Sequence, residues 1–270
     1  MTLLKSKNIL GISEKLDKYN KTLCKKIGKS LGDIAMYAVG IKDENASCFK
    51  DVIVGVVPIT CGNGIISGFC ETIKSIVEML GFKCFVTQNN DISGLEEAYK
   101  RQANVIFIAD DDKFIAINTS SNKIAENSFD TGRGYAAALE LMSGGLKDKT
   151  VVLIGAGHVG FGAASFMISC GARVLIYDIL KQKSENLKKL LPKVEILEDL
   201  DTDLKNNNLI FDATNAKDVI LEEHVDDNTL ISAPGIPLGL AENCISIVKD
   251  RLIHDILEIG VATMLYDALS

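Results

Sequence analysis

The chain has 270 residues, 47% hydrophobic and 24% charged, a composition typical of a globular protein with one or two domains. Its formal net charge of −7 at pH 7 argues against the basic face that nucleic-acid-binding proteins carry. The seven cysteines form no C-x-x-C pair and none lies at zinc-binding spacing from a histidine, so we expect no metal site. With no signal-peptide pattern at its start, the chain is expected to be cytoplasmic with reduced thiols.

The first half of the chain predicts an α/β domain behind an amino-terminal helix at residues 6–28. Apolar runs rich in Val and Ile predict strands, and apolar residues at helical spacing predict the helices between them. The predicted strands are 51–59, 83–87 and 104–109, and the predicted helices are 63–81, 93–102 and 129–142. Such alternation is typical of a parallel sheet, and the breaker sequence SGG at 143–145 then divides the chain into domains 1–145 and 146–270.

The second half predicts a Rossmann-type domain, in which a parallel sheet binds a dinucleotide at its carboxyl edge. Its predicted strands are 150–155, 172–178, 208–214, 228–235 and 251–255, and its predicted helices are 158–170, 181–191 and 258–269, the last closing the domain. The uncharged stretch 150–172 is long enough to span a membrane. Because five glycines interrupt it, we expect a strand, a turn and a helix instead.

A glycine motif, GAGHVG at 155–160, joins the first of these strands to the next helix. Gly155 allows the tight turn, Gly157 lets the backbone approach a pyrophosphate, and Gly160 lets helix and strand pack closely. The helix begins at His158 and Val159, where free N–H groups and positive dipole charge face the phosphates. The motif by itself is a weak signal, and a glycine turn without a ligand, a methyltransferase site and a flavin site are alternatives.

An acidic residue strengthens the dinucleotide interpretation. Asp178 ends the strand that follows the motif, where a carboxylate accepts hydrogen bonds from the adenosine ribose and repels a 2′-phosphate. We therefore expect NAD rather than NADP as the cofactor. Loops of small residues after the later strands are expected to border the nicotinamide ribose or to be ordinary turns. These candidates are Ala213, Thr214, Pro234 and Gly235.

Two segments of the first half carry candidate substrate-binding groups. The segment PITCGNGII at 58–66 is a second glycine-rich helix entrance, whose N–H groups can hold a carboxylate or whose Thr60 or Asn63 can simply cap the helix. The acids 110–112 follow a strand, where one carboxylate can bind an ammonium group or take its proton, although three adjacent acids are also typical of an exposed turn. We expect Cys61 to pack rather than to act as a thiolate nucleophile.

The chain has only three histidines, which limits the candidates for acid–base catalysis. His254 ends the last predicted strand beside Asp255, so this pair is a candidate at the sheet edge. His224 lies in an acidic stretch that we expect at the surface, and no Ser-His-Asp order, H-E-x-x-H motif or P-loop is present.

Five longer motifs are more specific: VGVVPITCGNGIISGF (54–69), IADDDKFIA (108–116), GAGHVGF (155–161), ISAPGIP (231–237) and IGVATMLYDAL (259–269). Together they resemble the pyrrolysine synthase family, and the resemblance covers the whole chain. It implies that Asp110 is the first acid of the family's A-D-D segment and faces the substrate. It also implies a substrate site lined by Leu4, Thr60, Cys61, Asn63, Gly64 and Ile65.

The resemblance implies a reaction and an assembly. The family's substrate is lysine acylated on its side-chain nitrogen by 3-methyl-D-ornithine. NAD accepts hydride from the carbon bearing the ornithine's terminal amine, ammonia leaves, and the α-amine closes a five-membered imine ring. A homodimer is implied, with an amino-terminal helix that closes over the substrate.

The chain departs from the resembled family at two positions. The family usually has Ser where Cys61 stands and Glu where Asp255 stands. Asp255 is a methylene shorter than the family's Glu, so either Asp255 or His254 beside it is the candidate proton acceptor. A general NAD-dependent amino- or imino-acid dehydrogenase and a non-catalytic NAD-sensing regulator are the alternative functions.

Overall fold

The computed structural model describes residues 6–42, 49, 51–62 and 66–270, and the chain divides into two compact units. The first unit combines the residues up to Asp130 with Leu257–Ser270, and the second comprises Thr131–Ile256. In this described part of the chain, no helix has the length and hydropathy needed to cross a membrane. The stretch 150–172 forms a strand, a turn and a helix, as expected.

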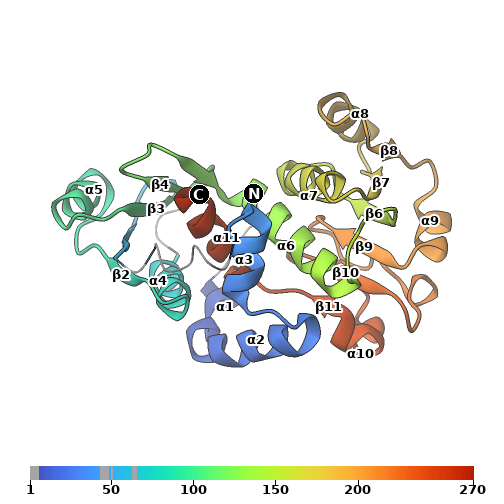
Figure 1. The fold of residues 1–270 in the computed structure, drawn as a ribbon, viewed down its shortest axis with the longest axis horizontal. Helices are drawn as coiled ribbons and strands as arrows, with labels where there is room; N and C mark the ends of the chain where they lie inside the picture. Colours follow the sequence, from blue (N-terminus) through green and yellow to red (C-terminus); the bar gives the residue numbers. More distant parts are fainter. Residues whose placement is uncertain (1–5, 43–48, 50, 63–65) are drawn as a thin grey trace. The chain divides into compact units, whose positions relative to one another are not determined.

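The first unit contains a five-stranded sheet in the order β2-β1-β3-β4-β5, of which Figure 1 labels β2, β3 and β4. Its strands are β1 Ile53–Val57, β2 Lys83–Val86, β3 Val105–Ala109, β4 Phe114–Asn118 and β5 Ile124–Glu126. The first three strands are parallel, whereas β4 pairs antiparallel with both β3 and β5. The expectation of a parallel sheet is therefore wrong at this edge. The Asp110 N–H donates to the Lys113 oxygen at 2.8 Å and closes a hairpin too short for a parallel crossover.

The helices of this unit are α1 Ser6–Ile9, α2 Ile12–Ile27, α3 Leu31–Val39, α4 Phe69–Met79, α5 Asp91–Lys100 and α11 Glu258–Leu269, and α6 Asn127–Ser143 runs from this unit into the second. Helices α4, α5 and α11 pack against the strands of the sheet, whereas α1 and α2 pack against α4, and α3 packs against α11. Helix α3, which the sequence analysis missed, begins with a capping box between Ser30 and Asp33.

The last helix belongs to the first unit and not to the Rossmann domain that it was expected to close. Helix α11 is buried over nearly its whole length and packs against α3, α4 and β4; in Figure 1 it lies beside α3. A helix that is apolar on all sides needs neighbours on all sides. The expected domains 1–145 and 146–270 therefore differ from the compact units. The second unit begins at Thr131 and not at 146, and it ends at Ile256 and not at 270.

The second unit contains a six-stranded parallel sheet in the order β11-β10-β9-β6-β7-β8. Its strands are β6 Thr150–Ile154, β7 Arg173–Tyr177, β8 Glu195–Ile196, β9 Leu209–Asp212, β10 Leu230–Ser232 and β11 Leu252–Ile253. Its helices are α7 His158–Ser169, α8 Lys181–Leu190, α9 Leu200–Asn206 and α10 Ile245–Val248, with short 3-10 turns η2 Glu222–His224, η3 Glu242–Cys244 and η4 Lys249–Arg251. This is the Rossmann strand order: β7 and β8 follow on one side of β6, and β9, β10 and β11 follow on its other side. The order in which strands are added therefore reverses between β6 and β9.

Strands β6 and β9 form the centre of this sheet. Each is buried at nearly every position, as parallel strands covered on both faces must be. Val152, Ile210 and Ile231 from three neighbouring strands pack in one apolar cluster. Asp212 is the exception, because it places a carboxyl group at the buried end of an otherwise apolar strand.

Candidate functional site

The glycine motif follows β6 and opens α7, as predicted. Gly155 has φ of 100°, a conformation that side chains disfavour, and a Cβ there would lie 3.0 Å from the Ala213 carbonyl carbon. A Cβ on Gly160 would lie 2.0 Å from the Gly155 oxygen. Gly157 differs, because nothing lies within 4 Å of the position that its Cβ would take. Two glycines thus serve packing, and the third leaves open space before a helix amino terminus, which fits a pyrophosphate.

His158 and Val159 form the first turn of α7. His158 is exposed. The Val159 oxygen lies against Gly132 of α6, where a Cβ would be only 2.0 Å away. The packing of α6 on α7 therefore fixes the direction of the helix that starts at the glycine motif.

Asp178 follows β7 and reaches back to the glycine motif. Its Oδ2 accepts a hydrogen bond from the Ala156 N–H at 2.9 Å, and its Oδ1 accepts one from the Leu180 N–H at 2.9 Å. A carboxylate has about four acceptor sites, so this partly exposed group retains lone pairs for ribose hydroxyls. The residues present therefore fit a dinucleotide.

The loops after β9 and β10 lie at the same carboxyl edge of the sheet. The Ala213 N–H donates to the Ile154 oxygen at 2.8 Å, which ties the first loop to the end of β6. A Cβ on Gly235, which follows Pro234, would lie 1.7 Å from the Thr214 oxygen. Gly235 is therefore required by the packing of the two loops against each other.

The predicted acid–base pair also lies at this edge. The His254 Nδ1 lies 2.7 Å from the Ala233 oxygen, and because a carbonyl only accepts, Nδ1 carries a proton. Asp255 is buried, and its backbone N–H and oxygen both bond to the Tyr135 hydroxyl, at 2.8 and 3.0 Å. A buried tyrosine of α6 thus holds the segment that carries the pair.

Sequence reasoning missed Asp212, which ends β9 and is fully buried. Its Oδ1 accepts hydrogen bonds from both the N–H and the hydroxyl of Thr214, at 3.0 and 2.7 Å. Burial raises the pKa of the Asp212 carboxyl above its usual range. The available signal was a lone carboxylate in the apolar run LIFDAT at 209–214.

The candidate substrate loop, the segment 58–66, follows β1 in the first unit. The N–H and hydroxyl of Thr60 donate to Oδ1 and Oδ2 of Asp91, at 2.7 and 2.5 Å. Thr60 therefore does not cap α4, which begins at Phe69 and not at 63 as expected. Cys61 is exposed, so the expectation that it packs in a core is wrong. Four further predicted site residues lie outside the described residues: Leu4, Asn63, Gly64 and Ile65.

The acids after β3 take two different positions. Asp110 is exposed, and its Oδ1 accepts hydrogen bonds from the N–H groups of Lys113 and Asp112, at 2.7 and 2.8 Å, which lower the pKa of the carboxyl. It is therefore a stable anion, suited to binding an ammonium group and a weaker base than an ordinary carboxylate. The Asp111 carboxylate lies close to Gly62 of the candidate substrate loop, since a Cβ on Gly62 would be 2.0 Å from the Asp111 Oδ2.

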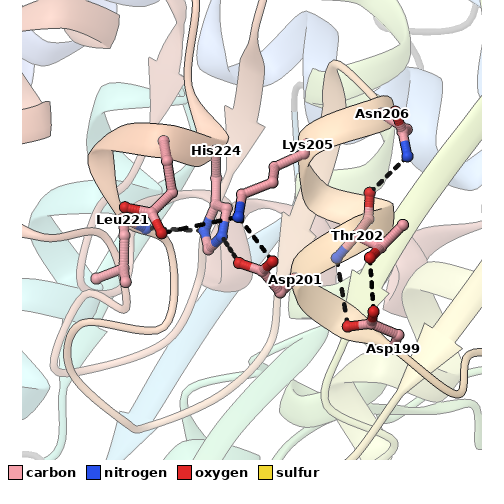
Figure 2. A network of polar contacts seen from close by, with 8 residues as sticks. Asp199, Asp201, Thr202, Lys205, Asn206, Leu221 and His224 are labelled. Carbon is pink, nitrogen blue, oxygen red and sulfur yellow. Dashed lines mark hydrogen bonds and ion pairs between the residues drawn. The ribbon is translucent and has the colours of Figure 1, made fainter.

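A polar cluster between α9 and η2 has the composition of a metal site (Figure 2). Its members Asp201, Glu223 and His224 bring their ligand atoms within 4.8 Å of one another. The His224 Nδ1 accepts the Leu221 N–H at 3.0 Å, so the proton is on Nε2, which donates to Asp201 at 2.9 Å. Both ring nitrogens are therefore engaged, and the cluster is better explained as a brace between the two elements. His224 is buried, not exposed as expected.

Comparison with known proteins extends these observations. The family model "Pyrrolysine biosynthesis protein PylD, N-terminal domain" matches residues 8–125, and the model "Shikimate / quinate 5-dehydrogenase" matches residues 137–232. A quinate dehydrogenase from Corynebacterium glutamicum, solved in complex with NAD, shares the fold with a TM-score of 0.51 at 12% identity, covering 81% of this chain and 92% of that chain.

Two curated relatives match over the whole chain. The "Pyrrolysine synthase" of Methanosarcina acetivorans is 35% identical over 271 residues, covering 100% of both chains. The "Pyrrolysine synthase" of Methanosarcina barkeri is 33% identical over 277 residues, covering 100% of this chain and 98% of the relative. The resemblance seen in the sequence motifs is thereby confirmed, and the chain belongs to the pyrrolysine synthase family.

Proposed function

We propose that this protein uses NAD to oxidise the terminal amine of 3-methyl-D-ornithyl-Nε-L-lysine, with loss of ammonia and closure of the pyrroline ring of L-pyrrolysine. The observation that carries the proposal is the similarity, over the full chain, to two relatives named pyrrolysine synthase. The position of Asp178 beside the glycine motif supports NAD as the dinucleotide.

The chemistry sets requirements for the protein. A bound NAD supplies the hydride acceptor. The amine must be neutral before hydride leaves the adjacent carbon, so a carboxylate, an imidazole or water must take its proton. The oxidised carbon is then attacked by the α-amine and ammonia departs, so the product is lighter by two hydrogens and one ammonia. Ring closure is intramolecular and needs little beyond positioning.

The proposal assigns roles to particular side chains. Asp110 stays ionised and binds a substrate ammonium group, in agreement with its lowered pKa. Asp255, or the neutral form of His254 through Nε2, takes the proton of the reacting amine. The proposed substrate-binding residues are Leu4, Thr60, Cys61, Asn63, Gly64 and Ile65.

The decisive experiment is NADH formation, followed by absorbance, from purified protein with NAD and the synthetic acylated lysine. A signal with this substrate but not with free lysine or ornithine, together with the expected product mass, supports the proposal. A signal with free amino acids points to a general dehydrogenase, and NAD binding without any signal points to a regulator. Asp110→Asn is expected to abolish turnover while NADH binding persists, and near-normal turnover removes Asp110 from the mechanism.

A homodimer is part of the same proposal, on the basis of the sequence resemblance. Light scattering coupled to size exclusion measures the mass directly. Twice the chain mass of 29.2 kDa supports the dimer, and a single chain mass at micromolar concentration contradicts it.

A further inference from the structure

A buried carboxyl that the proposed reaction does not use lies where the strand order of the Rossmann sheet reverses. Asp212 ends β9 and pairs directly with Ile154, the residue before the glycine motif. Rossmann domains bind their dinucleotide outside the carboxyl ends of the strands at this point. Asp212 is 0% exposed, so its side chain lies beneath this edge rather than on it.

The two oxygens of Asp212 have unequal surroundings. Oδ1 accepts the two hydrogen bonds from Thr214. Oδ2 is buried and has no hydrogen-bond partner within the part of the chain that the structure describes. It faces Gly239, where a Cβ would lie 2.1 Å from it. The Gly239 N–H is near enough to lower the pKa of Asp212, but it does not meet the geometry of a hydrogen bond with Oδ2.

The surroundings of Asp212 favour the neutral form of its carboxyl over the charged form. A buried charged oxygen without a donor is far less favourable than a buried neutral hydroxyl without a partner. The largest influence on the pKa of Asp212 is burial, which raises it, and the hydrogen bonds of Thr214 lower it less. Among the described residues, His254 after β11 is the titratable group whose charge acts on Asp212, and its Nδ1 is engaged with Ala233.

We propose that Asp212 is an uncharged carboxylic acid and the positioning residue of the dinucleotide-binding edge, where it holds Thr214 through Oδ1 and packs on the Gly239 turn through Oδ2. It acts on a bound dinucleotide through these two loops and does not touch the reacting atoms. This inference rests on the proposed dinucleotide site and is independent of the proposed substrate.

The chain offers a matched control for the test. Asp199 also accepts hydrogen bonds from the hydroxyl and N–H of one threonine, Thr202, but it is exposed (Figure 2). These bonds lower the pKa of Asp199, the opposite of the shift at Asp212. Asp212→Asn and Asp199→Asn thus make the same chemical change in two environments.

The experiment measures NADH affinity by calorimetry and the unfolding midpoint of the ligand-free protein between about pH 5 and pH 9. A raised pKa means that the folded state holds a proton which it loses as pH rises, so the contribution of Asp212 to wild-type stability should be lost as pH rises from the usual carboxyl range through the raised pKa. Asp212→Asn is an uncharged isostere; it should keep NADH affinity within about threefold and gain stability relative to wild type as pH rises. Asp199→Asn should show no such gain, because a lowered pKa stabilises the ionised wild type.

Two results would overturn the inference. One is NADH binding that is weakened about tenfold or more by Asp212→Asn at every pH, which would mean that the ionised carboxylate is required. The other result is an infrared spectrum of wild-type protein with carbon-13-labelled aspartate that lacks a protonated-carboxyl band at neutral pH. This measurement does not require the variant to fold. Neither measurement involves the substrate, so failure of the proposed reaction leaves both interpretable.

Discussion

Thr60 donates both its backbone N–H and its hydroxyl to the carboxylate of Asp91, which stands 31 positions later in the chain. Asp91 begins α5 with φ of 54°, a conformation that is uncommon for residues other than glycine. Its own N–H donates to the Pro58 oxygen at 2.9 Å. A single residue therefore holds the start of the candidate substrate loop through both Pro58 and Thr60, and it does so with a strained backbone.

Asp91→Ala should raise the KM for the acylated lysine on the order of tenfold, because the loop that carries Thr60 loses its anchor. The Kd for NADH should not change, since the dinucleotide residues lie in the second unit. Hydrogen bonds from Thr60 lower the pKa of Asp91, so the anchor is present above the usual carboxyl range and lost as pH falls through the lowered pKa. The KM of the wild type should therefore rise as pH falls through the lowered pKa, and the KM of the variant should not show this rise.

The control for this variant is Asp148→Ala, because Asp148 also has a positive φ, of 61°, but lies in the second unit. It reports the backbone cost of placing alanine in this conformation. If both variants raise KM equally, or if Asp91→Ala leaves KM unchanged, Asp91 does not position the substrate loop.

The glycines of the motif should separate stability from binding. Gly160→Ala places a Cβ 2.0 Å from a backbone oxygen and should lower the free energy of unfolding by about 1–3 kcal/mol. Gly157→Ala meets no atom within 4 Å and should change it by less than about 0.5 kcal/mol. The same Gly157 methyl would stand where a pyrophosphate approaches, so NADH affinity should fall about tenfold or more. Denaturant unfolding and calorimetry on both variants check this pair, and normal NADH affinity in Gly157→Ala contradicts the assignment.

Asp178 should determine the choice between the two nicotinamide dinucleotides. Asp178→Asn keeps the size of the side chain and removes the negative charge, so repulsion of a 2′-phosphate is lost and ribose binding weakens. The ratio of NADH affinity to NADPH affinity should fall by about tenfold. Parallel titrations with NADH and NADPH measure this ratio. Tighter binding of NADPH than NADH by the wild type would show that Asp178 does not have this role.

His224 should act as a structural brace. His224→Ala removes a buried side chain and, with it, the acceptor of the Leu221 N–H, and should lower the free energy of unfolding by about 1–3 kcal/mol. Removal of divalent metals with a chelator should leave the wild-type midpoint unchanged, because both ring nitrogens are already hydrogen-bonded. Lys205→Ala, which removes an exposed ion pair with Asp201, is the control and should have little effect. A midpoint that shifts with chelator or added zinc would establish a metal site.

Several features could be predicted from the sequence because they depend on local pattern. The apolar strand, the glycine motif, the helix and the acid at the end of the next strand follow one another within about 30 residues, and βαβ geometry brings such neighbours together. The Rossmann sheet, the positions of Gly155 to Gly160 and the placement of Asp178 beside them were therefore predictable. The family followed from longer motifs spread over the whole chain.

The tertiary structure decided what depends on contacts between distant segments. Periodicity does not show that α11 joins the first unit or that β4 turns back as an antiparallel strand, since both follow from which apolar surfaces find each other. Nor does it show that Thr60 bonds to Asp91 or that Asp212 is buried with an unpaired oxygen. The ionisation and hydrogen bonding of a side chain depend on desolvation and on the donors around it, and only the folded chain brings those together.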